Sequence, residues 1–187
     1  ERLVGVITID DAMAVLDEEH EEDILRLAGV SDESSLSDRV RDTTLRRLPW
    51  LAVNLATAIL ASLVIAEFDA VIAQVVALAV LMPIVASMGG NAGTQTLTVT
   101  VRALATRDLG RANMMRFIGK ELAVGVFNGF AFALLTGIVA GVWFADVMIG
   151  IIIGLAMIVN MIVAGVAGTA IPIGLDRAKI DPAVASG

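Results

Sequence analysis

The chain has 187 residues, of which 57% are hydrophobic and 18% are charged, whereas soluble domains have roughly 45–50% and about 25%. A chain of this length has no core large enough to bury so much apolar surface, so its composition excludes a soluble globular domain. The net charge of −7 argues against nucleic acid as a partner. With no cysteine and one histidine in the sequence, disulfides are excluded and a structural zinc site is disfavoured.

The whole net charge lies in the first 47 residues, which hold 13 acidic and 6 basic side chains, whereas the remaining residues hold 7 of each kind. Residues 3–9 are rich in β-branched side chains, which predicts a strand, and Asp10 and Asp11 are expected to cap the helix that follows. We expect residues 1–30 to form the C-terminal strand and helix of a cytoplasmic domain. Because the chain begins inside this motif, without Met or a signal peptide, we expect a fragment of a longer protein.

Residues 31–48 form the predicted linker between this acidic part and the membrane. Leu36, Val40, Thr44 and Leu48 recur every four residues, and arginines surround them. This pattern predicts a basic amphipathic helix that runs along the cytoplasmic face of the membrane.

Four stretches without Asp, Glu, Lys or Arg are long enough to cross a bilayer, namely residues 48–66, 70–101, 122–145 and 147–175. They predict an all-α polytopic membrane domain over residues 49–175, with spans of about 49–66, 70–101, 117–145 and 147–173, and a cytoplasmic connection at 176–187. Pro49 is expected in the first turn of the first span. The second and fourth stretches exceed one crossing, so each must tilt, extend beyond the bilayer or be interrupted.

The distribution of basic residues predicts the orientation of these spans. If the spans alternate in direction, residues 1–47, 102–121 and 176–187 share one side, and that side holds all 13 Lys and Arg residues. The opposite side holds only Glu67, Asp69 and Asp146 as charged residues. The positive-inside rule then predicts a multi-pass protein of the plasma (inner) membrane with a cytoplasmic N-terminus.

The second charge-free stretch contains polar residues and helix-weakening residues at membrane depth. Pro83 has no N–H group, so the carbonyl of Ala79 loses its helical partner. Three glycines and a cluster of Asn, Thr and Gln follow, up to residue 96. Unpaired polar groups are costly in hydrocarbon, so the pattern predicts an interrupted helix beside water and a hard cation such as Mg²⁺.

Close helix packing is the alternative interpretation of these glycines. Gly89 and Gly93 form a small-xxx-small pair, a spacing that lets two helices approach closely. The same spacing recurs in the other spans, where we interpret it as packing: Gly125/Gly129, Gly137/Gly141 and Gly150/Gly154.

The run from Pro83 to Ala105, PIVASMGGNAGTQTLTVTVRALA, closely resembles the second-span signature of the MgtE magnesium channels. The resemblance continues in chain order in Arg47–Leu51, in Lys120 and Glu121 with Gly125, Asn128 and Gly129, and in Pro172 with Asp181–Gly187. Residues 3–23 resemble the closing strand and helix of the second CBS domain of such proteins. Five blocks in register make this resemblance far more specific than a lone Gly-Gly-Asn-Ala-Gly.

The resemblance implies a homodimer with its pore on the dimer axis, lined by the second span and by a fifth span beyond residue 187. By position in the motif, the implied ion path includes Pro83, Gly89, Gly90, Asn91, Gly93 and Thr94. Asn91 and Thr94 are expected to face the pore, and the glycines to allow a close approach there. The principal Mg²⁺ ligand of the family is an aspartate on the fifth span, so this segment is not expected to conduct alone.

The resemblance also implies that Mg²⁺ is regulatory as well as transported. Regulatory Mg²⁺ is expected near the acidic side chains of Asp17, Glu18, Glu19, Glu21, Glu22 and Asp23, where a divalent ion relieves repulsion; a solvated helix face is the alternative. Glu121, beside Lys120, either transmits gating or is an interfacial charge. CBS domains commonly bind adenosine compounds, so an adenine nucleotide is an expected partner of the upstream region.

Two other functions stay open from the sequence: an ion-coupled transporter of another divalent cation, and a CBS-linked membrane sensor that transports nothing. Coupling favours a titratable group within a span, and the four charge-free stretches contain none. No nucleophile–base pair, P-loop or metalloprotease motif suggests an enzyme. Asn54, Asn128 and Asn160 lie within spans, where we expect interhelical hydrogen bonds.

Overall fold

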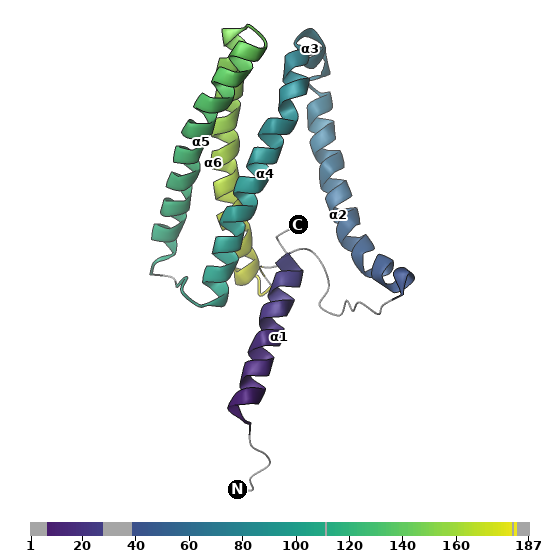
Figure 1. Cartoon of the computed structure of the whole chain (residues 1–187), viewed down its shortest axis with the longest axis vertical. Helices are drawn as coiled ribbons and strands as arrows, with labels where there is room; N and C mark the ends of the chain where they lie inside the picture. Colours follow the sequence, from purple (N-terminus) through teal and green to yellow (C-terminus); the bar gives the residue numbers. More distant parts are fainter. Residues whose placement is uncertain (1–6, 28–38, 111, 181, 183–187) are drawn as a thin grey trace.

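The computed structural model describes residues 7–27, 39–110, 112–180 and 182. The helices in chain order are α1 (Ile9–Leu27), α2 (Val40–Ala66), α3 (Asp69–Gln74), α4 (Val76–Ala105), α5 (Met114–Trp143) and α6 (Val147–Arg177). Within these ranges, α2, α4, α5 and α6 are long and apolar enough to cross a membrane (Figure 1). The predicted all-α fold with four membrane spans is therefore confirmed.

The beginning of α1 differs from the prediction that Asp10 and Asp11 cap it. Thr8 precedes the first helical residue, and its Oγ1 accepts a hydrogen bond from the Asp11 amide at 3.2 Å. In return, Asp11 Oδ2 accepts from the Thr8 amide at 2.9 Å. This reciprocal pair is a capping box, in which Asp11 stands at the third helical position. Residues 3–6 of the expected strand lie outside the described residues.

From Val40 onward, the linker and the first span form one helix. The described part of the linker begins at Arg39, and α2 continues from Val40 to Ala66 with Pro49 inside it, not in a first turn. Figure 1 shows α2 bending toward its N-terminal end. A proline within a helix removes one backbone hydrogen bond and bends the helix, but the turns on both sides keep their own bonds.

The second charge-free stretch is interrupted at a different place from the one predicted. α3 ends at Gln74, and Val75 has φ −127° and ψ 76°, outside helical values, before α4 begins. From Val76 to Ala105 the helix is continuous, through Pro83 and the glycine cluster. The predicted break at Pro83 is therefore wrong. Pro83 removes a single backbone hydrogen bond, and the packing of α4 along α6 keeps α4 helical at this point.

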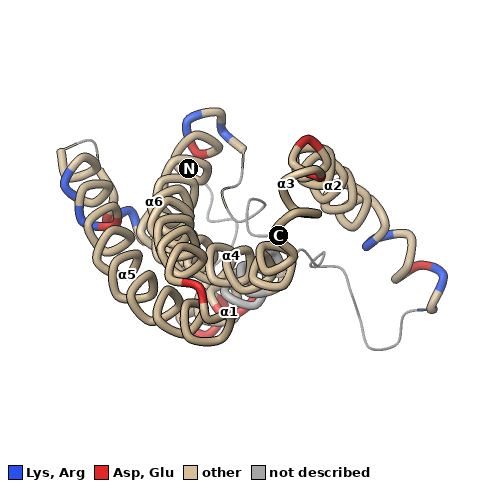
Figure 2. Tube along the Cα trace, turned by 90° about the horizontal axis from the view of Figure 1, so that it is seen from above, with Lys and Arg blue, Asp and Glu red and all other residues tan. Residues whose placement is uncertain are grey.

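α6 lies between α5 and α4 and packs against both, whereas α4 and α5 touch each other little (Figure 1). The buried apolar residues of the described helices include a cluster of Ala77, Leu81, Ala140, Ile149 and Ile153 and a cluster of Ala133, Met157 and Met161. In the view along the bundle, α2 and α3 stand apart from α5 and α6 (Figure 2), and no residue of α2 is buried.

Glycines set the close approach of α5 and α6. A Cβ atom added to Gly150 would lie 2.5 Å from the carbonyl oxygen of Gly137, and one added to Gly154 would lie 3.2 Å from that of Ala133. A Cβ on Gly125 would lie 3.0 Å from the carbonyl oxygen of Met161. These contacts leave no room for side chains, so the packing interpretation of the three glycine pairs in α5 and α6 agrees with the structure.

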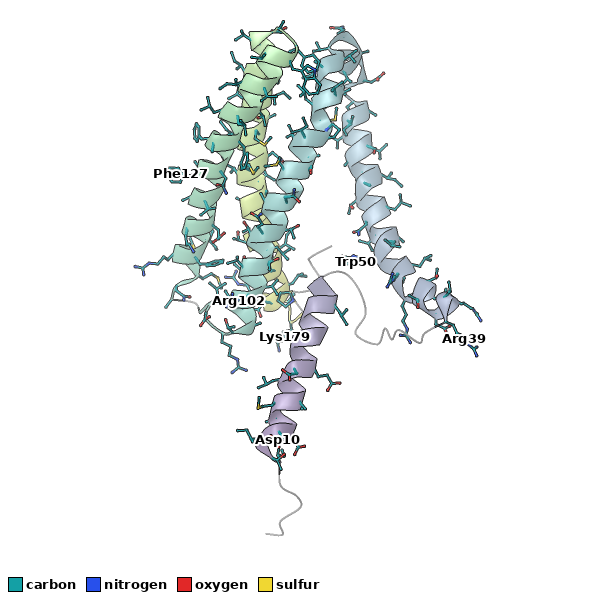
Figure 3. All side chains as sticks on the ribbon, in the orientation of Figure 1. Asp10, Arg39, Trp50, Arg102, Phe127 and Lys179 are labelled. Carbon is teal, nitrogen blue, oxygen red and sulfur yellow. The ribbon has the colours of Figure 1, made fainter. Side chains whose placement is uncertain are left out.

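The charged residues gather at the two ends of the membrane helices. Arg39, Arg102 and Lys179 lie at the same end, where α2 and α5 begin and α4 and α6 end (Figure 3). At that end, Arg177 Nη2 lies 3.2 Å from Met114 Sδ and joins α6 to α5. At the opposite end, Asp146 Oδ1 accepts a hydrogen bond from the Met148 amide at 2.8 Å and caps α6.

Candidate functional site: a polar groove between two membrane helices

α4 has a buried face and a polar face. Leu81, Gly89 and Thr100 are buried toward its neighbours. The polar face consists of Asn91, Thr94, Gln95 and Thr98, which are all exposed. These positions follow the i, i+3, i+4, i+7 spacing of one helix face, so the helix itself separates the packing residues from the polar ones.

Asn91, Thr94 and Gln95 of the polar face line a cavity of about 420 Å³ between α4 and α5. Its lining residues are Met88, Asn91, Ala92, Thr94 and Gln95 of α4, Asn128 and Phe132 of α5, and Met161 of α6. A second cavity of about 190 Å³ shares Ala92, Gln95, Asn128 and Met161 with the first and adds Glu121 of α5. We call these two cavities together the α4–α5 groove.

The α4–α5 groove brings together amide, hydroxyl and carboxylate oxygens from two helices. Asn91 and Thr94 were predicted from the motif, and both line the groove. Gln95 lies in the same motif, but Asn128 was expected to bond to another helix. Among the described residues Asn128 makes no such bond and lines the groove instead. The sequence feature that could have indicated this position is a polar amide side chain within an apolar span.

The three motif glycines and Pro83 do not share one environment. Gly89 is buried, and a Cβ there would overlap the side-chain amide of Asn160. Gly93 faces α6, where an added Cβ would be 3.9 Å from the Cβ of Ala164. Gly90 and Pro83 are exposed, and no heavy atom would lie within 4 Å of a Cβ on Gly90. Gly89 thus leaves the space that Asn160 of α6 occupies, whereas an added Cβ at Gly93 would make only an ordinary contact with α6.

Glu121 is an acidic side chain buried within the membrane helices. It is 7% exposed, although it stands in the second turn of α5. Its Oε1 lies 4.0 Å from Nζ of Lys120, whose side chain is 71% exposed. Because Glu121 also lines the smaller cavity, the α4–α5 groove carries a carboxylate near the end of the bundle where the basic residues gather.

The predicted regulatory cluster lies on α1. Asp17 and Glu18 are exposed, and the side chains of Glu19, Glu21, Glu22 and Asp23 lie outside the described residues. In the part of the chain whose side chains are placed, no group of three or more His, Cys, Asp or Glu residues is arranged to hold a metal ion. The regulatory assignment of these residues stays a prediction.

Four membrane-length helices with a polar groove between two of them define a multi-pass integral membrane protein. The model of the MgtE family, described as "Divalent cation transporter", matches residues 82–187, which include α5, α6 and most of α4. The chain belongs to the MgtE family. This is a family of transporters and not of enzymes.

The chain is similar to three proteins named "Magnesium transporter MgtE". The protein of Enterococcus faecalis is 37% identical over 187 residues, which is 100% of this chain. Those of Bacillus subtilis and Thermus thermophilus are each 34% identical over 99% of this chain, in alignments of 185 and 188 residues. In each case the aligned segment covers 41% of the relative, so the chain spans less than half the length of these relatives.

Proposed function

We propose that this chain is the transmembrane part of a Mg²⁺ channel or transporter, and that the ion passes along the α4–α5 groove. The observation that carries the proposal is the convergence of Asn91, Thr94 and Gln95 of α4 with Asn128 of α5 on one cavity in an otherwise apolar bundle. Polar side chains at membrane depth mark ion and substrate pathways. The relatives named as magnesium transporters support Mg²⁺ as the cargo.

The size and chemistry of the groove suit a hydrated divalent cation. The larger cavity, of about 420 Å³, has room for on the order of ten waters at roughly 30 Å³ each. Mg²⁺ dehydrates reluctantly and usually keeps several of its six waters. Amide and hydroxyl oxygens such as those of Asn91 and Thr94 therefore accept hydrogen bonds from the water shell more readily than they replace it.

We propose that other parts of the protein cover the open side of the α4–α5 groove. Asn91, Thr94 and Gln95 are exposed on the single chain, although polar side chains are costly against lipid. A second copy of the chain and a fifth span beyond residue 187 would cover them, with the pore on the axis of a homodimer. The principal Mg²⁺ ligand is expected on that fifth span, as the family resemblance implies.

Gating by cytosolic Mg²⁺ is the second part of the proposal. The exposed carboxylates of Asp17 and Glu18 lie on α1, which precedes the long helix α2. Mg²⁺ bound among such acids and the neighbouring Glu21, Glu22 and Asp23 lowers their mutual repulsion and holds the cytoplasmic domains together. A cytoplasmic N-terminal side is supported by the basic residues, which gather at that end.

The test is Mg²⁺ flux through the full-length protein in liposomes, together with rescue of growth at low Mg²⁺. Asn91→Leu removes an amide that accepts hydrogen bonds from the water shell of the ion, each worth about 0.5–1.5 kcal/mol, so flux should fall about two- to tenfold. The matched control is Asn54→Leu on α2, which lies outside the groove. Equal flux in the wild type and Asn91→Leu, at equal amounts in the membrane, would refute the groove as the path.

Two further measurements separate the alternatives. Flux that persists without any Na⁺ or H⁺ gradient rejects a coupled transporter. Loss of growth rescue in Asn91→Leu, with normal expression, rejects a sensor that transports nothing.

A further inference from the structure

Asn160 of α6 joins α6 to α4 at the level of the α4–α5 groove. Its Nδ2 donates a hydrogen bond to the carbonyl oxygen of Val85 at 2.6 Å, which confirms the interhelical bond expected for this residue. In a helix the Val85 carbonyl also accepts from the amide of Gly89, and a carbonyl oxygen has two lone pairs. Asn160 therefore bonds to α4 without removing a helical hydrogen bond.

Gly89 provides the space that this bond requires. It is buried, and a Cβ at this position would overlap the terminal atoms of the Asn160 side chain. Val85 and Gly89 are four residues apart, so both lie on the same face of α4. The acceptor and the free space thus form a single slot on α4, into which the Asn160 amide fits.

Asn91 points away from this contact. Successive residues of a helix are about 100° apart, so Asn91 lies about 200° around α4 from Gly89. When Gly89 faces α6, Asn91 must face away from α6, and it is exposed on the side of the groove. A rotation of α4 by one residue would move Asn91 and Thr94 out of this position.

We propose that Asn160 is a positioning residue of the ion path: its bond to Val85, in the slot left by Gly89, sets the rotation of α4 that presents Asn91 and Thr94 to the ion. The inference rests on the proposed function. The close approach of Gly168 to Gly93 also turns this face of α4 toward α6, and the Asn160 bond adds a directional contact to this packing. A directional hydrogen bond favours a single rotation.

The rotation of α4 is measured with single cysteines in the full-length protein, in a background without other cysteines. Thr94→Cys reports the groove face and Thr96→Cys the buried face. A membrane-impermeant thiol reagent should modify position 94 at least about tenfold faster than position 96, because modification needs a water-exposed thiolate. With Asn160→Ala the ratio of the modification rates at positions 94 and 96 should fall severalfold. The ratio of Mg²⁺ flux to Ca²⁺ flux should fall with it.

Paired variants separate positioning from packing. Gly89→Ala alone should reduce the folded amount, because its methyl overlaps Asn160. The double variant Gly89→Ala with Asn160→Ala should restore the folded amount, but neither the thiol-modification ratio nor the flux ratio. Asn160→Ser keeps a hydrogen-bond donor, so it should retain part of both ratios. Restoration of both ratios by the double alanine variant would overturn the inference, as would unchanged ratios in Asn160→Ala.

The same experiment distinguishes failure of the inference from failure of the proposed function. If the reactivity ratio falls but Mg²⁺ flux and selectivity stay unchanged, Asn160 orients α4 but ions do not pass beside Asn91. That outcome refutes the groove as the ion path, and the positioning role in transport with it. If Asn91→Leu stops flux while Asn160→Ala changes nothing, the groove stands and only the positioning role fails.

Discussion

α6 and α2 are both long and apolar enough to cross a membrane, but they are packed very differently. α6 buries twelve residues, including Gly150, Gly154, Gly165 and Gly168, whereas α2 buries none and contains no glycine. Between membrane helices there is little hydrophobic driving force, because lipid is as apolar as the side chains. An apolar sequence thus identifies a helix that enters the membrane, whereas small residues identify the surfaces where such a helix packs closely against another.

The largest expected effect comes from placing one large side chain on each of these two helices. Gly150→Leu puts an isobutyl group where even a Cβ would lie 2.5 Å from the Gly137 carbonyl oxygen, and should cost at least about 3 kcal/mol. Ala58→Leu on the exposed surface of α2 should leave stability nearly unchanged. The amount of monodisperse protein after detergent extraction and its thermal midpoint measure both.

The two leucine variants test whether α6 is closely packed and α2 is not. A large loss with Ala58→Leu would mean that α2 is packed against something in the membrane, such as a second copy of the chain. A tolerated Gly150→Leu would mean that the α5–α6 contact does not depend on the absence of a side chain.

A single methyl group tests the other side of α6. In Gly168→Ala the new Cβ would lie 2.7 Å from the carbonyl oxygen of Gly93 and 2.9 Å from the Cβ of Thr96. Backbone atoms cannot move aside easily, so the variant should lose about 1–3 kcal/mol. Gly119→Ala on α5 is the matched control, because nothing lies within 4 Å of its added Cβ. Equal thermal midpoints for the two variants would contradict the close α4–α6 contact.

Much of the fold followed from composition and charge alone. Long stretches without charged residues predicted the four membrane helices, and the glycine spacings predicted close packing in α5 and α6. The family resemblance, which pointed to MgtE, is confirmed by the family match. These features are local, so single residues and their spacing suffice to predict them.

The errors concern features that depend on a distant partner. Pro83 predicted a break in the second span, but α4 is continuous there and the break lies at Val75. For Gly89 both an ion-path position and close packing were expected; it faces Asn160, 71 residues further along the chain, which agrees with the packing interpretation and leaves its place in the ion path a prediction. The sequence shows which residues permit close contact, and only the packing of α4 on α6 shows what occupies the space.

A smaller difference between α6 and α2 lies at their N-terminal ends. Asp146 caps α6 by accepting from the Met148 amide at 2.8 Å, whereas Arg39 precedes α2 in extended conformation without a side-chain cap. Asp146→Ala should cost about 1 kcal/mol, and Arg39→Ser should stabilise the first turn of α2 by some tenths. Hydrogen exchange of the amides at 148–150 and 41–43 measures each effect; unchanged protection in both variants would contradict it.

The smallest expected effect concerns α1, whose described side chains are exposed except for the half-buried Leu25. Hydrogen bonds from the hydroxyl of Thr8, and then from its amide, lower the pKa of Asp11 below its ordinary value. A lowered pKa in the folded state means that the stabilisation is complete above the ordinary value of about 4 and is lost as the pH falls through the lowered pKa.

Thr8→Val removes the hydroxyl but keeps the shape of the side chain. Protection of the first amides of α1 should then be lower at neutral pH, and the pKa of Asp11 should rise toward its ordinary value. Asp11→Asn should abolish the pH dependence of that protection while leaving the amides of α6 unaffected. The measurement is hydrogen exchange from about pH 6 to about pH 3, the range in which aspartate titrates. If protection is independent of pH in the wild type, the ionised carboxylate of Asp11 contributes nothing to the stability of α1.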